Sequence, residues 1–403
     1  MASRFALQEI GSLKKPLWRL QAYRGDPVSE QALREAETWG QRLGVEGYRE
    51  LLDLLGQPDS PEKRRSVLEW SIRYALRFFE SVGLDRVYTG EQARVEMYEH
   101  VARRVQNFEI RGSVNSLDYA YYSKGAIIGR PVYKQHIYLD EFLIAKRLAR
   151  RPLKVPITGP YTMVDWSFNE YYEGLRRRSI GDWRTVRIER LKLEGRRDFL
   201  LDLVDAVYRP EIRALVEAGA EWIQVDEPAL TSRPEDEEMR LFVEAWNRMV
   251  EGFSCRFSLH NCYSDYRLLA RFAPQLKKCS QLALEFANRD SLALGVTGEA
   301  RPGYQDLRHF VEWGYEGEFG LGLLHVHRYD GGGSSHARVV GGFLVESPEL
   351  VRDRILYACS IVGADRIACN PDCGGRRMPW EVYHRKLQSL RRGAELAAEV
   401  IGC

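Results

Sequence analysis

The segment WIQVDEPAL at residues 222–230 is a short apolar run that ends in two acids. A second run, RFSLHNCYSD at residues 256–265, ends in His260 and Cys262. Between the two, apolar residues recur at three- and four-residue steps over residues 234–250, which is the spacing of one helix face. A strand, a helix and a second strand in this order predict a parallel pair joined by a right-handed crossover. This unit indicates an α/β fold.

The same alternation continues along the chain. Helical patterns occupy residues 62–79, 139–149 and 201–218. The candidate strands are short apolar runs at residues 5–11, 86–90, 154–159, 222–226, 256–260, 282–286, 321–327 and 366–370. About eight strand–helix units predict a closed (β/α)8 TIM barrel. A ninth candidate strand at residues 132–138 means that one of the nine lies outside the barrel.

Many of these candidate strands end in polar residues, or in a glycine and a polar residue. They are Gly11-Ser12, Gly90-Glu91, Asp226-Glu227, His260-Asn261-Cys262, Glu285, His327 and Asp372-Cys373. The carboxyl ends of barrel strands meet on one face, and catalytic residues sit on that face. We therefore expect residues hundreds of positions apart in the sequence to share one pocket.

Composition narrows the function classes. The chain has 403 residues, of which 44% are hydrophobic, so it can bury a large core. Lys and Arg number 59 against 57 Asp and Glu, and a net charge of +2 argues against a dedicated nucleic-acid binder. No run of about 18 apolar residues predicts a membrane span. Seven scattered cysteines and a start without an apolar leader favour a cytoplasmic protein with reduced thiols.

Four residues at candidate strand ends form a predicted metal site. His260 and Cys262 are two residues apart, so their side chains can point to the same side of a strand end. A tetrahedral site needs two more ligands, which Glu285 and Cys373 can supply. An imidazole, two thiolates and a carboxylate suit zinc better than calcium or magnesium. The other cysteines are interpreted as ordinary thiols.

Seven motifs, in order, resemble segments of the catalytic domain of cobalamin-independent methionine synthase. They are EIGS (9–12), GLDRVYTGEQARVEMYEH (83–100), ITGPYTMVDWSF (157–168), IQVDEPAL (223–230), HNCYSD (260–265), LALEFANRD (282–290) and NPDCGG (370–375). The resemblance covers almost the whole chain and implies a single zinc-dependent methyltransferase barrel over residues 1–403. This barrel type is shared with uroporphyrinogen decarboxylase. The large N-terminal domain of the longer family members has no counterpart, so the chain resembles the short form.

The resemblance implies a role for each matched residue. The implied zinc ligands are His260, Cys262, Glu285 and Cys373. Ile10, Ser12, Glu91 and Asp226 would hold the amino acid substrate, homocysteine, with the two acids suited to its ammonium group. Trp166 corresponds to an aromatic residue that packs against a folate. His327 corresponds to the proton donor, which departure of a methyltetrahydrofolate nitrogen requires.

Three segments depart from the family pattern, and all fall on the side of the methyl donor. Residues 171–197 are rich in arginine, residues 328–343 carry Gly331–Gly333, and residues 115–133 replace a shorter stretch. The two additions near 171–197 and 328–343 are predicted to form a rim for the donor. That donor is methyltetrahydrofolate, a related pterin or a methylated corrinoid protein. Two alternatives are another zinc-dependent thiol alkyltransferase, of the epoxide–coenzyme M type, and a zinc-free decarboxylase-like lyase.

Overall fold

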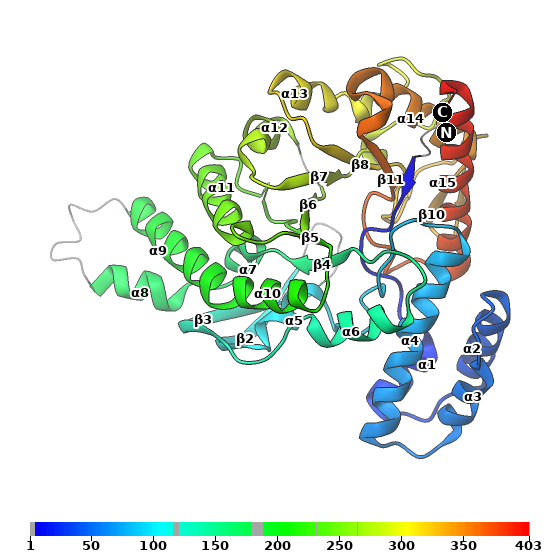
Figure 1. Ribbon diagram of the computed structural model, residues 1–403, viewed down its shortest axis with the longest axis horizontal. Helices are drawn as coiled ribbons and strands as arrows, with labels where there is room; N and C mark the ends of the chain where they lie inside the picture. The colour runs from blue at the N-terminus through cyan, green and yellow to red at the C-terminus, as the bar shows by residue number, and fades with distance from the viewer. Residues whose placement is uncertain (1–4, 116–120, 179–187, 231, 264, 403) are drawn as a thin grey trace.

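Parallel strands form the centre of this computed structural model, which describes residues 5–115, 121–178, 188–230, 232–263 and 265–402. Seven strands pair in the order β1-β11-β8-β7-β6-β5-β4 (Figure 1). Their bounds are Ala6–Leu7 for β1, Val155–Thr158 for β4, Trp222–Asp226 for β5, Arg256–Asn261 for β6, Cys279–Leu284 for β7, Glu318–Gly322 for β8 and Ile367–Asn370 for β11.

Residues 86–87 close the sheet into a ring. Arg86 forms a parallel bridge to Gln8 beside β1, and Val87 forms one to Leu153 beside β4. The backbone N–H of Lys154 donates to the carbonyl of Val87 at 3.1 Å, and that of Arg86 donates to Leu7 at 3.2 Å. The segment predicted as a strand at residues 86–90 therefore takes the place of the eighth barrel strand, and it pairs with its two neighbours through one bridge on each side. The predicted (β/α)8 barrel is confirmed.

The ninth candidate strand lies outside the ring, as expected. Residues 132–138 begin at the end of β3 (Tyr121–Tyr133), which pairs antiparallel with β2 (Val105–Asn115). The hairpin joins the barrel through a bridge between Ala126 and Phe168, which follows α7 (Pro160–Asp165), and through an ion pair between Arg130 and Asp202. The departure at 115–133 is thus most of this hairpin.

The predicted strand at 321–327 is wrong in its bounds, because β8 spans Glu318–Gly322. An added Cβ on Gly322 would lie 2.6 Å from the carbonyl oxygen of Leu284, so the strands approach closely there. Backbone pairing with the end of β11 continues for two more residues, because the N–H of Leu323 donates to the carbonyl of Asn370 and the N–H of Asp372 donates to that of Leu324. The N–H of His325 then donates to Glu346 Oε1 at 2.7 Å. His327 therefore sits in a loop beyond the strand end.

Helices surround the sheet (Figure 1). The long ones are α4 (Pro61–Ser81), α6 (Leu139–Leu148), α9 (Ile188–Leu203), α10 (Arg209–Glu217), α11 (Asp236–Val250), α14 (Pro348–Val362) and α15 (Trp380–Ile401). The short ones are α5 (Met97–Ala102), α12 (Arg267–Phe272) and α13 (Leu307–Glu312). Ser60 caps α4 by accepting from the Lys63 N–H, with Pro61 in the first turn, which is a typical helix start. Among the described residues, no helix is long and apolar enough to cross a membrane.

Three groups of elements extend beyond the minimal barrel. α1 (Leu17–Arg24), α2 (Glu30–Arg42) and α3 (Tyr48–Gly56) form a lobe beside α4 (Figure 1). α8 (Glu170–Arg178) and the start of α9 project together from the side of the barrel (Figure 1). β9 (Ala337–Val340) and β10 (Phe343–Glu346) form an antiparallel hairpin. The second group overlaps residues 171–197 and the third overlaps residues 328–343, the two segments named as additions from the sequence.

Polar side chains fill the middle of the barrel. Gln8 donates to Gln281 Oε1 at 2.9 Å and to Asn370 Oδ1 at 3.0 Å, and all three side chains are fully buried. Buried amides are tolerated when they are hydrogen-bonded to one another. These hydrogen bonds join β7 and β11 to the residue that follows β1 inside the barrel.

Candidate metal centre and active site

Three predicted ligands meet at the carboxyl ends of β6 and β11. His260 lies within β6, Cys262 follows it directly, and Cys373 follows β11. Their ligand atoms all lie within 4.8 Å of one another. In the described part of the chain, this is the one group of three or more His, Cys, Asp and Glu side chains placed to hold a metal ion.

The His260 ring is oriented for coordination. Its Nδ1 lies 2.9 Å from the carbonyl oxygen of Ala283, which can only accept, so Nδ1 carries the proton. Its Nε2 is buried and has no hydrogen-bond partner. An imidazole held through one nitrogen while the other faces two sulfurs is the usual arrangement of a metal-binding histidine.

The two thiols favour one shared negative charge. A hydrogen bond from Cys262 holds the pKa of Cys373 well below its usual range, although burial opposes this. The same hydrogen bond, together with burial, raises the pKa of Cys262. Two cysteine sulfurs and an imidazole nitrogen are a donor set that fits zinc.

Glu285, the fourth predicted ligand, lies next to this group and contacts His327. It follows β7 directly and is fully buried. Its Oε1 lies 2.9 Å from His327 Nε2, and its Oε2 accepts from the backbone N–H of Tyr263 at 3.0 Å. The structure therefore pairs the predicted fourth ligand with the predicted proton donor.

His327 is held on both sides of its ring. Tyr263 hydrogen-bonds His327 Nδ1 through its hydroxyl, and the two ring centroids are 4.3 Å apart. Burial opposes the charged imidazole, but the hydrogen bond and charge of Glu285 raise the pKa of His327 above its ordinary value. The ring is thus set up to carry a proton beside the three ligands.

The residues predicted to bind the amino acid substrate come together from three parts of the barrel. Gln224 Nε2 donates to Asp226 Oδ1 at 2.7 Å and to the carbonyl of Ile10 at 2.6 Å, linking β5 to the chain after β1. An added Cβ on Gly11 would lie 3.3 Å from Glu91 Oε1, and one on Gly374 would lie 2.5 Å from Ser12 Oγ. Since Gly374 follows Cys373, Ser12 lies beside this predicted metal ligand.

Comparison with known proteins decides the family. A family model described as "Cobalamin-independent synthase, Catalytic domain" matches residues 53–396. The chain belongs to this family. It is therefore a methyltransferase rather than a decarboxylase-like lyase.

Several methionine synthases from other organisms are similar to this chain. A methionine synthase of Thermoplasma acidophilum is 37% identical over 336 residues, which cover 81% of this chain and 88% of the relative. One of Thermococcus kodakarensis is 31% identical over 388 residues, covering 96% and 91%. A solved B12-independent methionine synthase from Shewanella sp. W3-18-1, in complex with selenomethionine, aligns over 100% of both chains with a TM-score of 0.70 and 18% identity, which supports the fold.

Two buried acids lie near the site, and neither was assigned a role from the sequence, although Asp372 was named there among the polar strand ends. Neither carboxylate oxygen of Glu9 has a hydrogen-bond partner, and burial raises its pKa to about 8. Asp372 Oδ1 accepts from the N–H groups of Phe286 and Ala287, at 3.0 Å each, and so joins the ends of β11 and β7. Each acid stands next to a predicted residue, Ile10 or Cys373, and that adjacency was the available signal.

Trp166 belongs to an aromatic group beside the site. It follows α7, whose first turn is fixed by Glu227: the N–H groups of Tyr161 and Thr162 donate to this carboxylate at 3.0 and 2.7 Å. The Trp166 ring lies 5.2 Å from that of Tyr122 on β3. Arg376, shortly after Cys373, lies over Tyr122 at 5.2 Å. The sequence did not predict Tyr122 or Arg376 as site residues.

The arginines of the first addition are engaged with nearby acids. Arg176 lies 2.9 Å from Asp198 of α9, and Arg177 lies 3.8 Å from Glu173 of its own helix. Residues 179–187, the middle of this addition, lie outside the described residues. The second addition lies near His327, the predicted proton donor. The ring centroid of Tyr329, in this addition, is 5.5 Å from that of His325, and the centroid of His325 is 5.7 Å from that of His327.

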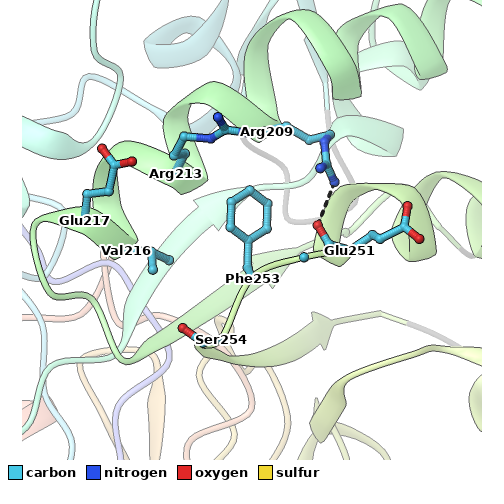
Figure 2. A pocket seen from close by; sticks show the side chains of 8 residues that line it. Arg209, Arg213, Val216, Glu217, Glu251, Phe253 and Ser254 are labelled. Carbon is cyan, nitrogen blue, oxygen red and sulfur yellow. Dashed lines mark hydrogen bonds between the residues drawn. The ribbon is translucent and has the colours of Figure 1, made fainter.

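A surface cavity lies at the opposite end of the sheet from these residues. Its lining comes from α10 and from the segment that precedes β6 (Figure 2). The predicted metal ligands lie instead at the carboxyl ends of the strands. Arg209 crosses it to donate to the carbonyl of Glu251 at 3.0 Å (Figure 2). At the amino end of a barrel, such a cavity is remote from the catalytic face.

Proposed function

We propose that this chain transfers a methyl group to the thiol of homocysteine, forming methionine, with zinc held by His260, Cys262 and Cys373. Glu285 is the proposed fourth ligand. The observation that carries the proposal is the buried, unpartnered Nε2 of His260 facing two sulfurs, within a chain of the synthase family. When bound, zinc would favour the thiolate form of the substrate, which is the nucleophile.

The carboxylates of Asp226 and Glu91 are proposed to bind the ammonium group of homocysteine. Burial raises the pKa of Asp226 to about 7, and the negative charge of Glu91 contributes to this rise. A cationic amino group placed between the two acids would stabilise both as carboxylates. Ser12 and the backbone near Ile10 are proposed to take the carboxylate of the substrate.

His327 is proposed to protonate the leaving group when the donor is an N5-methyl pterin. The new S–CH3 bond forms as the N–CH3 bond breaks, and the proton passes from His327 to that nitrogen. Glu285 supports this role because its charge stabilises the imidazolium. Tyr263 keeps the ring in one orientation. A methylated corrinoid protein, the other candidate donor, releases its methyl group without taking up a proton.

Asp226→Asn tests the acceptor. The variant keeps the shape of the side chain and removes its charge, so we expect the Michaelis constant for homocysteine to rise by at least about tenfold. The Michaelis constant for 4-sulfanylbutanoate, which lacks the amino group, should change less than about twofold. Steady-state kinetics with both thiols measure this. An equal rise for both would show that Asp226 does not bind the ammonium group.

Trp166→Ala tests the donor side. Loss of a stacking partner costs about 1–3 kcal/mol for a flat heterocycle, so the Michaelis constant for a pterin donor should rise roughly 5- to 150-fold. The constant for homocysteine should not change. Charge reversal at Arg176, Arg177 and Arg178 is compared with this variant. If these arginines form part of the predicted donor rim, their reversal should also raise the Michaelis constant for the donor. If donor kinetics are unaffected by Trp166→Ala, this aromatic group is not the donor surface.

A further inference from the structure

We propose that Arg94, together with Glu141 and Thr89, positions the carboxylate of Glu91 for the amino group of the substrate. The inference rests on the proposed function, in which Glu91 is an ammonium-binding residue. It adds three residues that do not touch the substrate but determine how it is selected.

Glu91 has an unusual backbone conformation. It lies in the turn after residues 86–87, and its φ is +57°, in the left-handed region that residues other than glycine rarely adopt. Its N–H donates to Thr89 Oγ1 at 3.1 Å. A strained residue persists only where its surroundings hold it, and such residues concentrate at functional sites.

Four side chains and this N–H form a closed ring of hydrogen bonds. Arg94 Nη1 donates to Glu91 Oε1 at 3.2 Å, and Arg94 Nε donates to Glu141 Oε2 at 2.8 Å. Thr89 Oγ1 donates to Glu141 Oε1 and accepts from the Glu91 N–H, which completes the circuit. The guanidinium group also lies 4.7 Å from the ring centre of Tyr138. Each member of the ring therefore fixes the next.

The charged members of the ring differ in burial, and Glu91 is the most exposed of the three. The side chains of Arg94 and Glu141 are 2% and 3% exposed, whereas that of Glu91 is 16% exposed. Burial alone would raise the pKa of Glu141, but the charge of Arg94 holds it below its ordinary value. Both acids are thus paired with one arginine.

The charges of the ring do not cancel. One arginine and two carboxylates leave one negative charge, and Glu91 is the member that reaches the open side, next to Gly11. Glu91 also raises the pKa of Asp226, so the two carboxylates act on each other. Lys15 is a further cation on this side of Glu91, and burial lowers its pKa to about 8 although the charge of Glu91 opposes this. An α-amino group bound between Glu91 and Asp226 would stabilise both acids as carboxylates.

The double variant Arg94→Gln/Glu141→Gln tests the proposal. It removes the two most buried charges of the ring together and leaves Glu91, the more exposed acid, as the charge that remains. We expect the Michaelis constant for homocysteine to rise about tenfold, while the constant for 4-sulfanylbutanoate, the zinc content and the turnover number at saturating homocysteine change less than about twofold. Arg94→Lys keeps the charge but loses the paired geometry and should lie between the wild type and the double variant.

The control is Arg77→Gln/Glu80→Gln, which removes a largely buried ion pair three residues apart on α4, whose side chains are 11% and 9% exposed. It should leave the preference for the amino thiol unchanged. Equal effects on both thiols in the ring variant, or no effect on either, would overturn the proposal. If Asp226→Asn also fails to separate the two thiols, the proposed function fails; if Asp226→Asn separates them and the ring variant does not, only the role of the ring fails.

Discussion

Cys262→Ser and Cys373→Ser are each expected to lose zinc and to lower the rate of methionine formation by more than about a thousandfold. A serine hydroxyl is not deprotonated at neutral pH and does not replace a thiolate as a zinc ligand. Without the metal, the homocysteine thiol stays mostly protonated and is a poor nucleophile. Elemental analysis of the purified variants and a methionine assay measure the two effects.

Cys279→Ser is the matched control. Cys279 is buried at the start of β7, away from the three ligands, and burial raises its pKa to about 12. We expect this variant to keep one zinc per chain and most of its activity. Full retention of zinc by both the Cys262 and Cys373 variants would contradict the assigned site.

His327→Gln is expected to lower the turnover number by about 10²- to 10⁴-fold with an N5-methyl pterin as donor. Glutamine can keep a hydrogen bond to Glu285 but cannot deliver a proton to the departing nitrogen. Because His327 does not bind the acceptor in this scheme, the Michaelis constant for homocysteine should change little. Tyr263→Phe, which removes only the hydroxyl that orients the ring, should have a smaller effect.

The same variant separates the two candidate donors. A pterin requires a proton on its leaving nitrogen, whereas a methylated corrinoid does not. If His327→Gln is nearly as active as the unmodified protein with every accepted donor, His327 is not the proton donor. If activity is lost with a pterin and kept with a methylated corrinoid protein, the role of His327 is confirmed for the pterin alone.

The parts of the site that depend on strand ends could be predicted from the sequence. His260, Cys262 and Cys373 lie at the ends of short apolar runs, and a parallel barrel brings such ends together whatever their distance in the chain. Asp226 follows the same rule, since it pairs in register with His260 across neighbouring strands. Periodicity predicted where these residues lie, whereas their roles were implied by the resemblance to the family.

Other parts depend on contacts that no local pattern encodes. His327 was expected at a strand end, but β8 ends at Gly322, backbone pairing with the end of β11 stops at Leu324, and the next N–H, that of His325, donates to Glu346. The pairing of Glu285 with His327 joins two separate loops, and the ring through Arg94 uses Glu141, which lies on α6. Glu9 reads in the sequence as a polar residue beside a strand, and only the folded barrel shows that its carboxylate is buried without a partner.

X-ray absorption at the zinc edge, on the zinc-loaded protein with and without homocysteine, tests the central claim most directly. We expect two sulfur ligands at about 2.3 Å from Cys262 and Cys373 in the protein alone, and a third sulfur when homocysteine is bound. Binding of the amino acid, verified in the same sample by isotope label, with the sulfur count unchanged would contradict the account.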